Sequence, residues 1–231
     1  MSICAIWGAP QTGKTTLAVN LAYAVSRGDQ SVCLISPVAY SELSAILGIK
    51  IPEENSLGAA LRGASLRQTA FKADELFYVL AAPSAASALD CDYSGEQVKT
   101  LLELARLTFD LVLVDCLSET NDLFSAWALN RADKVLLCAG GHVSGVLWHS
   151  ANKKALQAAQ SKTVYIGSEI IPCLDYAAMY KLLKCTPEII IPHIREAPLF
   201  QNERRFLFAL SGKKGRAYAG AIGKLYEAVS L

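Results

Sequence analysis

The chain has 231 residues, of which 52% are hydrophobic and 19% are charged. This balance excludes a disordered chain, and a chain of this length buries roughly 70% of the surface that its unfolded form exposes. Lys and Arg number 22 against 21 Asp and Glu, a net charge of +1, which disfavours a nucleic-acid binder held by a strong overall field. The length suits one α/β domain, and we expect residues 1–231 to form a single one.

The cysteine pattern indicates a reducing compartment, and the other segments predict neither a signal peptide nor a membrane span. Seven cysteines are scattered without a Cys-x-x-Cys pair, a pattern typical of buried free thiols rather than of disulfides or zinc ligands. The first charged residue is Lys14, so the start lacks the basic region of a signal peptide. Glycines interrupt the uncharged stretch 135–152, which argues against an inserted membrane span. We therefore expect a soluble, cytoplasmic protein.

Short apolar runs alternate with longer helical patterns along the chain. The runs have the length and near-continuous apolarity of strands that are buried on both faces of a parallel sheet. They occupy residues 3–7, 32–35, 77–81, 111–114, 135–139, 164–166 and 189–191. Between the second and third runs, residues 55–62 could form a short helix, but we interpret residues 50–75 as a surface excursion.

Three helices have clear signals. The first runs from Thr15 to about Ser26, the second opens with the capping-box pattern at residues 94–97, and the last begins at about Gly215. Strands that alternate with helices require right-handed crossovers. The sequence therefore predicts an α/β fold, a doubly wound and mostly parallel sheet with helices on both faces.

The strongest motif is G-x-x-x-x-G-K-T, which begins at Gly8. It follows a predicted strand and opens a predicted helix, the context that identifies a phosphate-binding P-loop. Backbone amides of such a loop surround a phosphate, the lysine contacts the β- and γ-phosphate oxygens, and the Thr hydroxyl coordinates Mg²⁺. The predicted nucleotide-binding residues here are Gly8, Ala9, Pro10, Gln11, Thr12, Gly13, Lys14, Thr15 and Thr16.

An acidic residue ends the apolar run 111–114. This residue, Asp115, has the Walker B arrangement, in which a carboxylate at the end of a strand holds the metal beside the P-loop. A helix or loop cap is the alternative, and the P-loop favours the metal role. We predict that Thr15 and Asp115 hold Mg²⁺ and that Lys14 and Asp115 are catalytic.

Several segments resemble one family in the same order. Residues 13–22 read GKTTLAVNLA, residues 109–115 read FDLVLVD and residues 132–137 read ADKVLL. They are similar to the G-K-T-T-x-x-x-N-L-A, F-D-x-V-I-I-D and A-D-x-V-I-x patterns of the MinD/ParA family of P-loop ATPases. The resemblance implies the P-loop NTPase fold, ATP or ADP with Mg²⁺ as ligands, and a protein partner.

Two positions depart from that family. Its signature lysine after the first glycine is Ala9 here, and its acidic residue past the second strand is matched by Ser36 and Val38. Stabilisation of the transferring phosphoryl group and positioning of the attacking water are the main catalytic needs. We therefore expect ATP binding with weak or absent hydrolysis. Glu119 and Asp122 are candidate replacement acids, although such acids more often are solvated or cap the next helix.

The resemblance also suggests where the base binds. Family members hold the adenine partly with the loop after the last strand, so Pro192, His193 and Ile194 are candidates by position. A family asparagine near the end of the sixth strand is replaced, since Gly167 and Ser168 stand there.

Within the family, the loss of these catalytic residues most resembles the CpaE/TadZ-like localisation proteins. We therefore predict a nucleotide-dependent positioning or regulatory switch, either a monomer or an ATP-independent homodimer, without membrane insertion. A DNA-partitioning ATPase is one alternative, with basic clusters at residues 204–205 and 213–216, although the net charge predicts weak DNA binding at most. A biosynthetic ligase of dethiobiotin-synthetase or CobQ-like type and a scaffold with a relic P-loop are the others.

Overall fold

The computed structural model describes residues 1–39, 41–84, 92–119, 121–140 and 142–230. Its strands form one eight-stranded sheet in the order β3-β4-β2-β5-β1-β6-β7-β8. The strands are β1 (Ser2–Gly8), β2 (Val32–Ile35), β3 (Phe71–Lys72), β4 (Phe77–Leu80), β5 (Leu111–Asp115), β6 (Lys134–Gly140), β7 (Thr163–Glu169) and β8 (Ile189–Pro192). All neighbouring pairs are parallel except β3 with β4. The predicted apolar runs coincide with every strand except β3.

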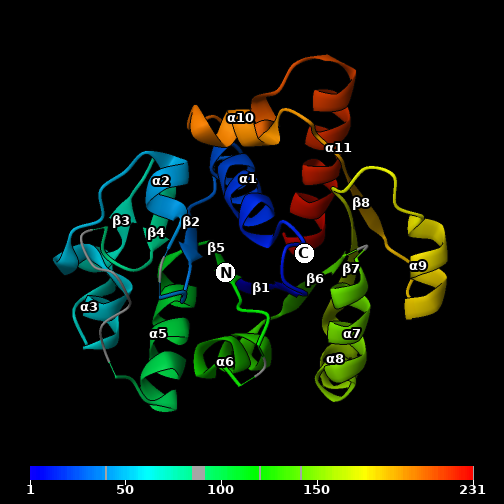
Figure 1. Ribbon diagram of the computed structural model, residues 1–231. Coiled ribbons are helices and arrows are strands. Elements are labelled where there is room, and N and C mark those ends of the chain that lie inside the picture. Colours follow the sequence, from blue (N-terminus) through cyan, green and yellow to red (C-terminus); the bar gives the residue numbers. More distant parts are fainter. Residues whose placement is uncertain (40, 85–91, 120, 141, 231) are drawn as a thin grey trace.

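Helices cover both faces of the sheet (Figure 1). They are α1 (Lys14–Arg27), α2 (Leu43–Leu47), α3 (Leu57–Leu61), α4 (Leu66–Thr69), α5 (Gly95–Thr108), α6 (Leu123–Arg131), α7 (Val143–Ala151), α8 (Lys153–Ala159), α9 (Tyr176–Leu183), α10 (Ala197–Asn202) and α11 (Gly212–Val229). Three 3₁₀ turns are η1 (Glu53–Asn55), η2 (Gln160–Lys162) and η3 (Leu207–Ala209). The doubly wound α/β fold predicted from the sequence is confirmed.

The two faces carry separate apolar cores because successive side chains of a strand point to opposite sides. In β1, Ile6 packs with the face covered by α1 and α11, while Ala5 and Trp7 pack with the face covered by α5 and α6. All residues of β1 after Ser2 are buried. A strand that is buried on both faces reads as a continuous apolar run, which explains why the sequence predicted it.

The preferred interpretation of residues 50–75 was wrong for its centre. All five residues of α3 are buried, so the short helix is correct and this part is no surface excursion. Gly58, Ala59 and Ala60 are small, which allows α3 to pack closely on its neighbours, and the Ser56 side chain caps the helix by accepting from the Ala59 N–H. Asn55 adds a hydrogen bond from its side chain to the Gln68 carbonyl.

The predicted helix boundaries hold within a few residues. Helix α1 begins at Lys14, and α5 carries both hydrogen bonds of the capping box between Ser94 and Gln97. Helix α11 begins at Gly212, somewhat before the predicted start. Among the described residues, none of the helices combines the length and apolarity that crossing a bilayer requires.

Candidate nucleotide-binding site

The P-loop connects β1 to α1 at the carboxyl edge of the sheet. Gly8 ends β1 with φ 149°, and Gly13 precedes α1 with φ 75° in the left-handed region. A Cβ on Gly8 would collide with the carbonyl oxygen of Cys138 in β6, so only glycine fits there. The positive end of α1 and the backbone amides before it form the cradle expected for a phosphate.

Lys14 lies folded back over this loop. Its Nζ donates to the carbonyl oxygens of Gly8 at 3.2 Å and Ala9 at 2.9 Å, and to Ser118 Oγ at 2.9 Å. Burial lowers the pKa of the Lys14 ammonium, and the nearby charge of Asp115 acts in the opposite direction. The ammonium group thus stands among acceptor oxygens at the centre of the loop, where phosphate oxygens would replace them.

Thr15 and Asp115, the pair predicted to hold the metal, lie in contact. The Thr15 hydroxyl donates to Asp115 Oδ2 at 2.7 Å, and Asp115 ends β5 in register with Ile6 of β1. Burial raises the pKa of Asp115, which is 4% exposed, while the Thr15 hydrogen bond and the Lys14 charge lower it. A hydroxyl and a carboxylate are the hard oxygen donors that Mg²⁺ prefers. These two residues therefore fit the predicted metal.

The candidate replacement acids differ in their surroundings. Asp122 caps α6 by accepting from the Ser125 N–H at 2.6 Å, so it has the capping role. Glu119 is exposed, one residue after Ser118. Sequence reasoning missed Glu42, an exposed acid at the start of α2 whose charge acts on Asp115 and raises its pKa, after the larger effect of burial. In the sequence, Glu42 stands four residues after Val38, the later of the two positions where the family pattern has its acid.

The positions that depart from the family pattern hold uncharged side chains in the structure. Ala9 is 1% exposed and lies against α7, where it shares a small space with Trp148 and His149. Ser36 is buried and Val38 is half-buried. Neither segment presents a charged side chain at the matching position.

A cavity of about 250 Å³ adjoins the P-loop on its β7–β8 side. Thr12, Gly13 and Thr16 line it from the loop and α1, and the predicted base-contacting residues Pro192, His193 and Ile194 line it from the segment that ends β8. The structure therefore brings three residues of the predicted P-loop set and the predicted base-contacting residues to one cavity.

Hydrogen bonds fix the walls of this cavity. His193 Nδ1 lies 2.7 Å from the Ile170 carbonyl oxygen, and Gln201 Nε2 donates to Thr16 Oγ1 at 2.8 Å. Sequence reasoning missed Gln201, Ile170 and Tyr218 as lining residues. Tyr218 fitted the apolar stripe of the last helix, so periodicity alone gave no sign of a second role.

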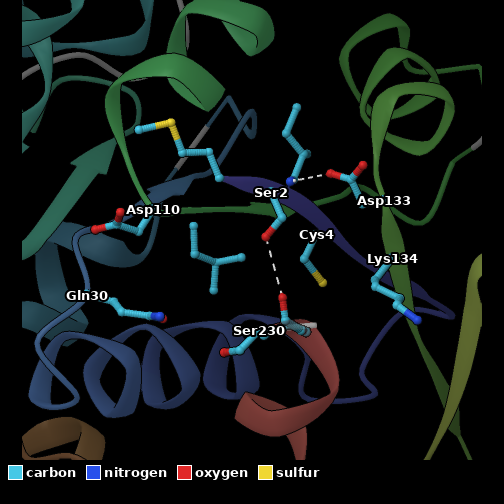
Figure 2. A pocket seen from close by; sticks show the side chains of 11 residues that line it. Ser2, Cys4, Gln30, Asp110, Asp133, Lys134 and Ser230 are labelled. Carbon is cyan, nitrogen blue, oxygen red and sulfur yellow. Dashed lines mark hydrogen bonds between the residues drawn. The ribbon is translucent and has the colours of Figure 1, made fainter.

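A second hollow of about 360 Å³ lies at the opposite, amino edge of the strands. Figure 2 shows Asp110 and Asp133 there, beside Ser2 and Ser230. Asp133 accepts from the Ile3 N–H at 2.8 Å and pairs with Arg106, and Asp110 accepts from Ser31. Because both carboxylates already have partners and the P-loop lies at the other edge, this hollow is not part of the site.

A loop bent by two glycines, a half-buried lysine and a hydroxyl–carboxylate pair stand together at the edge of a parallel sheet. Together they define a P-loop nucleotide-binding fold. Within that class, the chain has the fold of the MinD and ParA ATPases. No protein-family model matches the sequence, and no curated protein matches it either.

Three solved structures illustrate the similarity. MinD of Pyrococcus horikoshii, complexed with Mg-ADP, has a TM-score of 0.77 and 17% identity, over 97% of this chain and 95% of that chain. The MinC:MinD complex of Aquifex aeolicus has a TM-score of 0.78 and 20% identity, over 98% and 96%. A ParA family ATPase of Chlorobium tepidum has a TM-score of 0.79 and 14% identity, over 98% of each chain. The similarity covers nearly the whole length of both partners in each comparison.

Proposed function

We propose that this chain is a single-domain, cytoplasmic member of the MinD/ParA family that binds ATP or ADP with Mg²⁺ and acts as a nucleotide-dependent positioning or regulatory switch. The observation that carries the proposal is the 2.7 Å hydrogen bond between Thr15 and Asp115, beside a loop whose Lys14 is surrounded by acceptor oxygens. The MinD structure complexed with Mg-ADP supports the same ligands.

The residues of the loop divide the work of binding. Gly8 and Gly13 bend the backbone so that amides face the phosphates, and Lys14 exchanges its bonds to Gly8, Ala9 and Ser118 for phosphate oxygens. Thr15 and Asp115 would hold Mg²⁺, which when bound neutralises phosphate charge.

Weak or absent hydrolysis is part of the proposal. The buried Ala9 offers no cation to the transferring phosphoryl group, and Ser36 and Val38 offer no carboxylate to orient water. Glu42, four residues after Val38, and Glu119, four residues after Asp115, are exposed acids that could take this role. A switch that changes conformation with bound nucleotide requires binding, and its turnover can be slow.

We favour a protein partner over DNA because the net charge is only +1 and one of the two basic clusters has contacts within the chain. Of the basic clusters, Arg205 pairs with Glu203 at 2.9 Å, and the Arg204 side chain packs against Gly48. MinD of Aquifex aeolicus has been solved with the protein MinC. We propose a protein partner for this chain as well, in a localisation role of CpaE/TadZ-like type.

Calorimetric titration of ATP and ADP, with and without Mg²⁺, tests the proposal. Lys14→Ala should lose ATP affinity by more than tenfold, because a charge-assisted contact contributes about 1.5–3 kcal/mol. The matched control is Lys154→Ala, which removes an exposed lysine on α8 and should bind as the wild type does. Unchanged ATP affinity in Lys14→Ala would show that the loop does not hold phosphate.

A further inference from the structure

We propose that His142, which stands between β6 and α7, is a positioning residue for the phosphate-binding loop. Its imidazole lies against that loop, with Nε2 3.1 Å from the Pro10 carbonyl oxygen. Through this contact His142 holds the Pro10–Gln11 peptide in the orientation that offers the Gln11 N–H to a phosphate. The inference rests on the proposed nucleotide binding and adds a residue from outside the G-x-x-x-x-G-K-T motif.

The His142 side chain makes this hydrogen bond as the donor. A carbonyl oxygen only accepts, so the proton of the pair lies on Nε2. The other ring nitrogen, Nδ1, is buried and has no partner in the described part of the chain. His142 stands directly before α7, but its side chain makes no capping hydrogen bond to that helix. Among the described residues, the imidazole therefore hydrogen-bonds to the P-loop alone.

The bond to Pro10 sets the direction of the next amide. The described residues contain no cis peptide bond, and in a planar trans peptide the C=O and the N–H point in opposite directions. The Gln11 N–H therefore points away from His142, and it has no acceptor among the residues that the structure describes. Because Pro10 lacks an N–H, this amide is the first one after Ala9 that the loop can offer to a phosphate.

Gln11 needs this support because its backbone is strained. Its φ of 59° lies in the left-handed region, which glycine adopts freely and which the Cβ of any other residue disfavours. Such a conformation persists only where the surrounding structure holds it, and strained residues of this kind gather at ligand sites. The orientation of the Pro10–Gln11 peptide depends on the φ of Gln11, so the His142 bond restrains the strained angle directly.

The support from His142 does not depend on Lys14. The Lys14 ammonium contacts loop carbonyl oxygens, and in the proposed function it leaves them for the phosphates. Thr12 Oγ1 donates to the Ala9 carbonyl oxygen at 2.9 Å, as His142 does to that of Pro10. These two bonds can stay in place when Lys14 turns, so they hold the loop in its ligand-bound shape.

Glycine at the end of β6 makes room for this contact. A Cβ on Gly140 would lie 2.5 Å from Thr12 Cγ2 and 3.1 Å from His142 Cε1. A Cβ on Gly145 would in turn lie 3.0 Å from the Gly140 carbonyl oxygen, so α7 begins close to the strand. The His142 side chain is thus packed beside the P-loop and is half-buried.

Titration of His142→Ala and His142→Gln tests the inference. With Mg²⁺ present, His142→Ala should bind both ATP and inorganic tripolyphosphate about 3- to 10-fold more weakly, as expected for one hydrogen bond, because the loop acts on the phosphates. His142→Gln should keep most of the affinity, since its side-chain amide can donate to the Pro10 carbonyl oxygen. Ser144→Ala, which truncates an exposed side chain of α7, is the matched control and should bind as the wild type does.

Two further measurements separate positioning from a merely structural role. Glycine adopts a φ of 59° without strain, so adding Gln11→Gly to His142→Ala should recover part of the lost affinity. In ¹⁵N-labelled protein, tripolyphosphate should shift the Gln11 amide resonance of the wild type and shift that of His142→Ala less. Thermal melts without ligand should show that both variants are folded.

Three results would contradict the role of His142 and leave nucleotide binding standing. The first is a folded His142→Ala that binds both ligands as tightly as the wild type. The second is a His142→Gln that is as weak as His142→Ala, and the third is a Gln11 amide that responds equally in the wild type and in His142→Ala. If His142→Ala does not fold, His142 is a structural residue and the inference fails. A wild type that binds neither ATP nor tripolyphosphate would overturn the proposed function as well.

Discussion

Asp115 shows how a buried acid weakens the fold that carries it. Its carboxylate is buried at the end of β5, and the Thr15 hydroxyl and Lys14 offset only part of the desolvation. An acid whose pKa is raised in the folded state destabilises that state when ionised, and this penalty is relieved as the pH falls through the raised pKa. At neutral pH without Mg²⁺, Asp115 therefore carries an energetic penalty.

The first prediction follows from the destabilising effect of the ionised Asp115 carboxylate. Asp115→Asn without ligand should be as stable as the wild type or more stable at neutral pH, and its advantage should shrink as the pH falls toward about 4, where an ordinary carboxyl is protonated. The same variant should lose the Mg²⁺-dependent part of ATP binding. Thermal melts across pH and titrations with and without Mg²⁺ provide the measurements. A large loss of stability at neutral pH would instead make Asp115 a structural residue.

At the scale of elements, Ser118 forms one of the links between α7 and the P-loop. Ser118 Oγ accepts from Lys14, and the Ser118 carbonyl oxygen accepts from Trp148 Nε1 at 2.7 Å. The Trp148 ring lies edge-on to Trp7 of β1, with ring centroids 4.8 Å apart. When Lys14 turns to a phosphate, Ser118 loses its donor, and the indole bonded to the same residue changes its surroundings.

We therefore predict a change in tryptophan fluorescence when ATP and Mg²⁺ are added. The change should disappear in Trp148→Phe and persist in Trp127→Phe, whose ring lies on α6 beside Arg131. Ser118→Ala should reduce it without abolishing ATP binding. Titrating each variant at equal protein concentration checks the prediction, and a full signal in Trp148→Phe would break the proposed link between loop and helix.

The elements themselves could be predicted to different degrees. Parallel strands that are buried on both faces can be predicted from their continuous apolar runs. Helix α5 can be predicted from its capping residues Ser94 and Gln97. Strand β3, with only Phe71 and Lys72, is too short to show a pattern, and α3 exists because its neighbours cover it. Tertiary contacts, which local sequence does not encode, decide such short segments.

The candidate site likewise has residues that could be predicted from the sequence and residues that could not. The P-loop could be predicted because its contacts lie within one short stretch, and Asp115 because it ends a strand beside that stretch. Tyr218 and Gln201 reach the cavity from the last third of the chain, through packing of α10 and α11 on the sheet. Glu42 lies outside the expected register, so no spacing rule pointed to it.

For the whole molecule, the third prediction concerns turnover. The isolated protein should hydrolyse ATP far more slowly than the about 1–100 s⁻¹ of kinases, because Ala9 and Val38 supply neither cation nor water-orienting acid. Release of phosphate under saturating ATP measures it. If turnover is robust, Glu42→Gln and Glu119→Gln made separately identify the replacement group, and the weak-hydrolysis proposal fails.

Apolar exposure shows where copies of the chain could meet. The apolar stripe of α11, including Tyr218, Ile222 and Leu225, is buried against the sheet, so this helix has little apolar surface to offer a partner. Large exposed apolar side chains lie instead on α7, where Val143 is 77% and Leu147 is 65% exposed, and also on α5 at Leu107 and on α9 at Leu182. Val143 and Leu147 lie about one helical turn apart on α7, so we expect a contact between copies through apolar surface to use this helix.

The last prediction is that ATP drives little dimerisation. A ligand shifts an equilibrium only by its differential affinity for the two states. The resemblance to the MinD/ParA family implies a lysine at position 9 that reaches the nucleotide of a second copy, and the buried Ala9 of this chain offers no such charge. Sedimentation should therefore give the same mass with and without ATP and Mg²⁺. If a dimer forms under both conditions, Leu147→Glu should weaken it, because the charge would be buried in the contact. A dimer that forms only with ATP and is abolished by Lys14→Ala would contradict the prediction, since it would mean that another residue has replaced the missing lysine.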